Sequence, residues 1–419
     1  MATHPLHYPA AHRPALSIPS APADGMYTYA GVGHSVLADS WQAGRASLEA
    51  ALIPLHGRPP SLIITYFTNN HDPAQLLDGV RSLAQGATTV GACSSTVFAP
   101  SAILQQGVVT LALASNQIQA TAGAITQFTQ DPMGAGRDLM RQLWRPINPD
   151  TAPPNGLALM LESTHDSEAM VDVVEAVGNE IGPLLPVAGG RAIDETHRLE
   201  NSIFLDDCVY GDAVASVLFR TPGAVGVGVH HGYQPLGRPL VVTRVEGNVL
   251  YELDGKSAFA AYREQLPAHL NLTPENYVRH AVNHPIGLPQ MGREYIIRDP
   301  FASAPDGALL CAGALPKHSV VRIMRGDRVS LLEAARLAAA DALAALGGKP
   351  PLAAFIFSCV TRVAYLGDAI SEELALIRSV IGQETPLIGI ASYGEIAAQP
   401  FSPPAFHNKA IVVGLLGAP

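Results

Sequence analysis

Three stretches of the chain follow one pattern, and this repetition is what most constrains the fold. In each, an apolar run ends in polar residues, a helical pattern follows, and a second apolar run contains a glycine. The paired runs begin at residues 62 and 88, 157 and 185, and 352 and 386. Apolar runs without a solvated face are typical of strands inside a sheet. The pattern predicts an α/β (α+β) fold of repeated strand-helix-strand-helix-strand units.

Alignment of the three units places corresponding residues together. Aligning the later runs superimposes Gly91, Gly189 and Gly389, and it places Ser94 opposite Ser392. Aligning the central runs superimposes the hydroxyl residues that follow them, which are Thr68, Ser163 and Ser358. A chain that alternates helices and strands also produces similar runs by chance, and this alternative stays open.

Composition limits the class of protein. The chain has 419 residues, which is more than one hydrophobic core normally holds, so several domains are expected. Hydrophobic residues make up 48% and charged residues 15%, as in a well-buried globular protein. The net charge of −10, without a long Lys/Arg run, argues against a nucleic acid or an anionic membrane as partner. Four scattered cysteines favour neither a zinc site nor disulfides, so we expect a reduced, cytoplasmic protein.

The order of the patterns predicts two modules of mixed β-sheets flanked by helices. Residues 1–25, rich in Pro, Ala and His, are interpreted as a flexible tail. Residues 26–222 contain the first two units, and residues 223–419 contain the third. The second module is expected to open with a hairpin over residues 239–251, whose turn is Gly247-Asn248.

Polar residues that follow the strands of the third unit form the candidate ligand site. In open α/β sheets, ligands gather at strand ends, where the next helix offers free N–H groups. The candidate ligand-binding residues are Ser358, Cys359, Arg362, Ser392, Tyr393, Gly394 and Glu395. Arg362 is suited to grip a carboxylate, and Glu395 to hold an ammonium group. The alternatives are an internal salt bridge from Arg362 to Glu395 or Asp368, and hydroxyls that only cap helices.

No catalytic motif stands out. The chain has no Gly-x-Ser-x-Gly, no Gly-x-x-x-x-Gly-Lys and no His-Glu-x-x-His, so neither catalytic residues nor a metal site are predicted. A hydrolase or transferase that uses Cys359 or Ser392 is the alternative from another functional class. Histidines at predicted turns or strand ends are candidate haem ligands, namely His34, His230, His231 and His284.

Several stretches, in order, resemble FIST-domain proteins, in both the N-terminal and the C-terminal FIST modules. In the first module these are residues 61–67 and 90–95, and in the second they are residues 251–255, 284–287, 357–362 and 392–396. The first module has Thr96-Val97 where the family usually has a Gly-Glu-like pair. This departure moves the expected site to the C-terminal copy, Ser392-Tyr393-Gly394-Glu395.

The resemblance implies a non-enzymatic sensory module of signal transduction that binds a small ligand such as an amino acid. Because the chain leaves no room for an output domain, it is expected to act on a separate signalling protein, such as a histidine kinase or a cyclic-dinucleotide enzyme. The expected mechanism is a population shift on ligand binding. A haem-binding nitric-oxide sensor of the same family is the alternative within this class.

Overall fold

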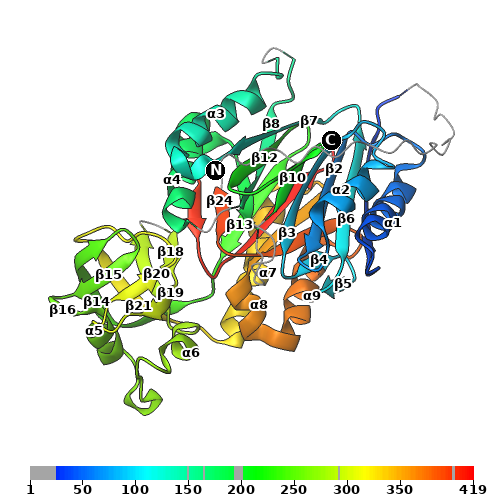
Figure 1. Ribbon diagram of the computed structural model, residues 1–419. Helices are drawn as coiled ribbons and strands as arrows, with labels where there is room; N and C mark the ends of the chain where they lie inside the picture. Colours follow the sequence, from blue (N-terminus) through cyan, green and yellow to red (C-terminus); the bar gives the residue numbers. More distant parts are fainter. Residues whose placement is uncertain (1–24, 149–150, 164–165, 193–201, 291–292, 399–401) are drawn as a thin grey trace.

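The computed structural model describes residues 25–148, 151–163, 166–192, 202–290, 293–398 and 402–419. A main body contains three six-stranded sheets, and a smaller lobe contains an eight-stranded sheet (Figure 1). The sheets mix parallel and antiparallel pairs and are flanked by helices, which confirms the predicted α/β class. Almost all of the predicted tail, residues 1–24, lies outside the described residues.

The first sheet is built mainly from the N-terminal segment. Its strands are β1 (Thr28–Ser35), β2 (Leu62–Thr68), β3 (Thr88–Ser94), β6 (Val108–Ser115), β10 (Ile203–Leu205) and β11 (Cys208–Tyr210). They are ordered β1-β6-β2-β3-β10-β11, and β2 and β3 are parallel. All seven residues of β2 are buried, as its continuous apolar run predicts.

The second and third sheets have the corresponding arrangement. The second contains β7 (Gln119–Thr126), β8 (Asn155–Ser163), β9 (Val187–Arg191), β12 (Ala213–Thr221), β24 (Glu395–Ala398) and β25 (Ala405–His407), in the order β25-β24-β9-β8-β12-β7. The third contains β4 (Val97–Ala99), β5 (Ala102–Leu104), β13 (Val225–His230), β22 (Pro351–Cys359), β23 (Leu387–Ser392) and β26 (Ile411–Gly417), in the order β13-β26-β22-β23-β4-β5. Each contains a parallel pair, β8–β9 or β22–β23.

Three hairpins leave the sheet of the preceding strand and complete another sheet. Hairpin β4–β5 follows β3 in the chain but pairs with β23 of the third sheet. Hairpin β10–β11 follows β9 but pairs with β3 of the first sheet. Hairpin β24–β25 follows β23 but pairs with β9 of the second sheet. The exchange therefore crosses the predicted boundary at residue 222, and the division into two modules stays a prediction.

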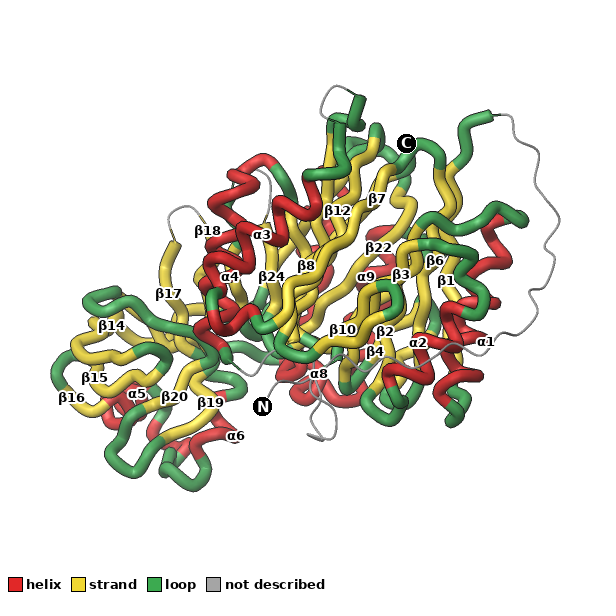
Figure 2. Tube along the Cα trace, turned by 45° about the horizontal axis from the view of Figure 1, so that its top comes forward, coloured by secondary structure: helices red, strands yellow, loops and turns green. Residues whose placement is uncertain are grey.

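The inner faces of the three sheets share one hydrophobic core. Apolar side chains of the three central strands meet there, represented by Ile64, Leu159 and Phe355. The outer faces are covered by helix pairs, of which those on the first and second sheets can be followed in Figure 2. These helices are α1 (Ser40–Leu52) and α2 (Pro73–Arg81) on the first sheet, α3 (Pro132–Trp144) and α4 (Ser167–Ile181) on the second, and α7 (Arg328–Ala345) and α9 (Ile370–Ile381) on the third.

Aspartate caps explain where several of these helices begin. The side chain at the N-cap of each accepts a backbone N–H from the first turn, which satisfies a donor that the helix itself leaves unpaired. The capping residues of α1, α2, α3, α4 and α7 are Asp39, Asp72, Asp131, Asp166 and Asp327. A short helix that the sequence patterns did not predict, α8 (Val360–Leu366), begins directly after β22.

The lobe is formed by the segment between the second and third sheets. Its strands are β14 (Gln234–Glu246), β15 (Val249–Leu253), β16 (Lys256–Ser257), β17 (Ile286–Gln290), β18 (Arg293–Arg298), β19 (Pro300–Ser303), β20 (Leu309–Cys311) and β21 (Val320–Arg325), and its helices are α5 (Ala258–Gln265) and α6 (Tyr277–Ala281). Strands β14 and β15 pair around Gly247 and Asn248, as predicted. Across the described ranges, no helix combines the length and apolar character that a membrane span requires.

The strand register corrects one position in the alignment of the three units. Gly91 pairs with Thr65, Gly189 with Met160, and Gly389 with Ile356. Three residues further along the central strands lie Thr68, Ser163 and Cys359. Cys359, rather than Ser358, therefore occupies the equivalent position. Strand β22 also has a register irregularity in its pairing with β26, between Pro351 and Ala353.

Close packing of α7 on β13 gives a stability prediction. A Cβ at Gly228 would lie 1.9 Å from the backbone oxygen of Ala338, which cannot rotate away. We expect Gly228→Ala to lower the free energy of unfolding by about 1–3 kcal/mol, measured by chemical denaturation. The matched control is Gly123→Ala in β7, where the nearest atom, at 2.9 Å, is the flexible end of Gln142. Equal stability of the two variants would contradict this packing.

Candidate functional site

The structure brings the two predicted ligand-binding segments together. Strands β22 and β23 are parallel neighbours, and Cys359 pairs in register with Ser392 at their carboxyl ends. Of the seven predicted residues, Tyr393 alone is exposed, with 42% of its surface accessible. The others are buried, including Ser358, Arg362 and Glu395 with none of their surface accessible. The predicted proximity is confirmed, whereas ligand binding by these residues stays a prediction.

The guanidinium of Arg362 forms all of its described contacts with other groups of the protein. Its guanidinium forms an ion pair with Glu373 of α9, with an Nη2–Oε2 distance of 2.6 Å. Nη1 and Nη2 also donate to the backbone oxygens of His231 and Leu331, at 3.1 and 2.8 Å. The Ser358 hydroxyl donates to Glu373 Oε1 at 2.6 Å. The internal salt bridge therefore exists, but its acceptor is Glu373 rather than Glu395 or Asp368, and it ties α8 to α9.

Glu395 lies in a buried hydrogen-bond network beside Cys359. Its carboxylate accepts hydrogen bonds from the Ser392 hydroxyl at 2.8 Å and from the backbone N–H of Ala410 at 3.0 Å. Burial raises the pKa of Glu395 to about 8, although these hydrogen bonds oppose the shift. Burial and the charge of Glu395 raise the pKa of Cys359 to about 12. The thiol therefore stays protonated at neutral pH, unlike an activated nucleophile.

The second unit adds two charged residues that the sequence patterns did not single out. Glu162 and Arg191 are register partners at the carboxyl ends of β8 and β9. Arg191 lies over the ring of Tyr393, 5.3 Å from its centroid. Burial raises the pKa of Glu162 to about 8, whereas the charge of Arg191 opposes this shift. Arg191 is thus the cation beside Tyr393, and the charges of both Arg191 and Arg362 act on Glu395.

The four candidate haem ligands lie in different surroundings. His34 is exposed on β1, while Nε2 of His230 lies 2.9 Å from Asp341. His231 is buried and its Nδ1 accepts the backbone N–H of Tyr233. In the lobe, burial lowers the pKa of His284, whose Nδ1 contacts the oxygen of His280. Within the described part of the chain, His, Cys, Asp and Glu side chains form no cluster of three or more that could hold a metal ion.

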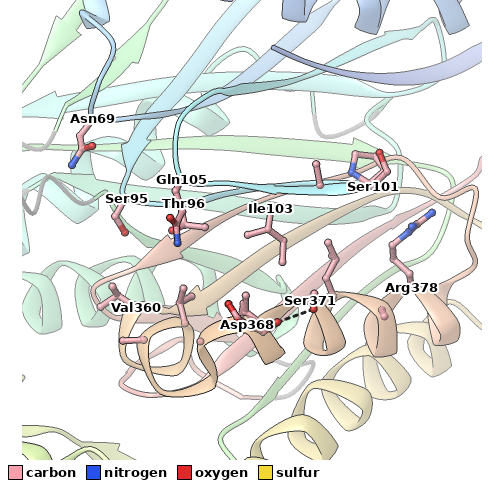
Figure 3. Close-up of a pocket in the computed structure, with 18 residues that line it drawn as sticks. Asn69, Ser95, Thr96, Ser101, Ile103, Gln105, Val360, Asp368, Ser371 and Arg378 are labelled. Atoms are coloured by element: carbon pink, nitrogen blue, oxygen red, sulfur yellow. Dashed lines mark hydrogen bonds between the residues drawn. The ribbon is translucent and has the colours of Figure 1, made fainter. Parts of the chain in front are cut away.

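A cavity of about 970 Å³ lies between hairpin β4–β5 and the helices α8 and α9 (Figure 3). One wall consists of hairpin residues such as Ile103, together with the turn Ser95-Thr96. The other consists of helical residues such as Val363 and Leu374. The predicted site residues do not line this cavity. However, Val360, which does, directly follows Cys359, so the buried network lies immediately behind the cavity wall.

Polar groups lie at opposite ends of the cavity. Arg378 of α9 extends toward Ser101 at one end, and Asn69 and Ser95 lie at the other (Figure 3). Between them, Asp368 projects from the 3-10 turn Gly367–Ala369, directly before α9. An apolar body with a few polar groups of opposite charge is the usual composition of a small-molecule site.

Buried polar contacts also connect this region to the lobe. Lys409 follows β25, is fully buried, and lies 3.0 Å from Asp299 of the lobe. The backbone N–H of Asp299 donates to the side chain of Asn408 at 3.2 Å, and Arg298 donates to the backbone oxygen of Phe406 at 3.1 Å. The charge of Lys409 also acts on Cys359. Residues 406–410, which include the N–H donor to Glu395, thus also contact the lobe.

Replacing Arg362 distinguishes a structural role from a ligand contact. Arg362→Met leaves Glu373 charged and unpaired in a buried site, so we expect a loss of roughly 3–5 kcal/mol in the free energy of unfolding. The matched control is Arg328→Met, which removes an exposed pair with Glu372 and should cost about 0–1 kcal/mol. Chemical denaturation measures both. An Arg362→Met protein as stable as the control would contradict the structural role.

The buried carboxyl groups predict how stability depends on pH. The pKa of Glu162 and that of Glu395 rise from 4.5 when unfolded to about 8 when folded, so the folded state holds these protons more tightly. Their contribution to stability is complete below pH 4.5 and is lost as pH rises toward 8. We expect Glu162→Gln to reduce the fall in Tm between pH 6 and 8.5 by roughly 2 °C or more. Exposed Glu180→Gln is the control, and an unchanged pH dependence in Glu162→Gln would refute the prediction.

Two relatives with similar sequences span most of the chain, and a third spans part of it. An uncharacterised protein of Mycobacterium tuberculosis is 25% identical over 391 residues, which cover 90% of this chain and 96% of that protein. An uncharacterised protein of Mycobacterium bovis is 26% identical over 394 residues, covering 87% and 93%. A third, from Methanocaldococcus jannaschii, is 27% identical over 147 residues, covering 31% and 27%.

Solved structures resemble the chain only distantly. A cyanuric acid hydrolase has 10% identity and a TM-score of 0.29, covering 93% of this chain and all of that one. PurLQS from Thermotoga maritima has 12% identity and a TM-score of 0.24, covering 93% and 72%. Similarity this low supports no statement about activity.

Two family matches together account for most of the sequence. The FIST N domain matches residues 61–256, and the FIST C domain matches residues 258–398. Their order is that of the stretches that carried the resemblance, except that residues 251–255, expected in the second module, lie within the FIST N match. The chain therefore belongs to the family of FIST-domain proteins.

Proposed function

We propose that this protein binds its small ligand in the cavity between hairpin β4–β5 and helices α8 and α9. FIST domains are sensory domains of signal transduction. The observation that carries the proposal is that both matched domains line the cavity. Residues 69–105 lie in the FIST N match, and residues 360–378 lie in the FIST C match. A ligand there contacts both and changes how they pack together.

A ligand that carries both a carboxylate and an ammonium group suits the charges of the cavity. Arg378 offers a guanidinium that binds a carboxylate, and Asp368 offers a carboxylate that binds an ammonium group. Ile103 and Leu374 supply apolar surface for a side chain. In this proposal the predicted residues Cys359 and Glu395 respond to the ligand from behind the wall rather than contacting it.

The signal passes from the cavity to the lobe through buried contacts. Ligand binding shifts the balance between conformations of α8. The N-cap of α8 is Cys359, which lies in the hydrogen-bond network of Glu395. Glu395 bonds the N–H of Ala410, next to Lys409, which is paired with Asp299 of the lobe. The lobe then presents a changed surface to a separate signalling protein, such as a histidine kinase or a cyclic-dinucleotide enzyme, in the cytoplasm.

Binding without turnover fits the buried groups better than catalysis. Cys359 keeps its proton because its pKa is about 12, and Ser392 is buried with its hydroxyl bonded to Glu395. Neither group lines the cavity. Both groups therefore act within the buried network behind the cavity and not as nucleophiles.

Filling the cavity tests the proposal. Ala375 is exposed within the cavity on α9, so Ala375→Phe occupies ligand space without disturbing the core. We expect this change to weaken binding at least tenfold, measured by calorimetry against amino acids, their amides and short peptides. The matched control is Ala344→Phe, at an exposed position of α7 outside the cavity. A compound that binds both variants equally would place the site elsewhere.

A further inference from the structure

Two opposite charges on one wall of the cavity are separated by a defined length of chain. Arg378 donates from Nη2 to the backbone oxygen of Gln383 at 2.5 Å, but its buried Nε has no hydrogen-bond partner within the described residues. A buried donor without an acceptor is costly, so the Arg378 side chain gains stability if it turns toward an acceptor that a ligand supplies. Asp368, exposed in the 3-10 turn directly before α9, provides the opposite charge.

The separation excludes simultaneous contact with a single amino acid. Arg378 lies ten positions after Asp368, which is in the 3-10 turn Gly367–Ala369 directly before α9. A helical rise of about 1.5 Å per residue places their Cα atoms about 15 Å apart along the helix axis. The ammonium and carboxylate groups of an amino acid are joined through one Cα atom, by bonds of about 1.5 Å each. An extended peptide adds about 3.3–3.6 Å per residue, so about four residues span the two charges.

We propose that the ligand is a short peptide with free ends, about four residues long, whose carboxylate binds Arg378 and whose ammonium group binds Asp368. This inference rests on the proposed function and names the chemistry of its ligand. The cavity volume of about 970 Å³ is at the upper end for small-molecule sites, which suits a peptide of this length. Apolar side chains of the peptide contact Ile103, Val363 and Leu374.

The edge of the third sheet supports an extended peptide independently. Strand β5 pairs with β4 and ends the strand order of this sheet, and Ala102 and Ile103 of β5 line the cavity. The outer backbone groups of an edge strand are available for hydrogen bonds to an added strand. A peptide that lies along β5 gains these bonds while its ends reach the two charges.

Calorimetry with a defined peptide tests the proposal. The probe is a tetrapeptide of alanine, leucine, leucine and alanine with free ends, compared with its C-terminal amide, its N-acetyl form and free leucine. We expect the amide and the acetyl form to bind at least tenfold more weakly, and leucine at least a hundredfold. Arg378→Met should abolish the preference for the free carboxylate, and Asp368→Asn the preference for the free amine. Arg336→Met on α7, at a half-buried position outside the cavity, is the control and should change neither preference.

The outcomes separate this inference from the proposed function. If leucine binds as tightly as the tetrapeptide and Ala375→Phe blocks it, the cavity is the site but the peptide proposal is wrong. If the tetrapeptide binds without preference for its free ends, the assigned charges are wrong. If no compound of either set binds the wild-type protein, both proposals fail.

Discussion

Hairpin exchange between the three main sheets is the constraint on which the rest of the structure depends. Each sheet is completed by a hairpin that follows a strand of another sheet, so no sheet is complete on its own. Because the inner faces also share one core, the main body is expected to fold and unfold as a unit. The exchange also creates the cavity, since it places β4–β5 of the FIST N match beside α8 and α9 of the FIST C match.

Buried charges define the wall behind that cavity. The ion pair between Arg362 and Glu373 fixes α8 relative to α9. The Ser358 hydroxyl donates a further hydrogen bond to the Glu373 carboxylate. Such a pair adds little net stability over apolar packing but strongly penalises arrangements that separate its members. Glu395 is held by Ser392 and a backbone N–H, so it also has a single favoured position. These contacts give the helices a defined resting arrangement, which a ligand can change.

Local patterns predicted much of the fold but little of the site. Continuous apolar runs identified the central strands, because burial on both faces leaves no alternation, and Gly247-Asn248 identified the turn of the lobe hairpin. The exchange of β4–β5 was not predictable, because short strands carry no mark of the sheet they join. The partner of Arg362 was missed because Glu373 lies on a different helix, eleven residues further along the chain. The direction in which Arg362 points depends on α8, a helix that the sequence patterns did not predict. Arg191 follows a glycine pair, but only the fold places it beside Tyr393.

Amide hydrogen exchange, with and without a compound from the calorimetric panel that binds, tests the central claim most directly. The account predicts slower exchange in two segments at once, residues 97–105 of the hairpin and residues 360–378 of α8 and α9, because the ligand bridges them. It also predicts a change around Asp299 in the lobe, through Lys409. Protection confined to one of the two cavity walls, or found only in other parts of the protein, would contradict the claim that the ligand joins the two FIST domains.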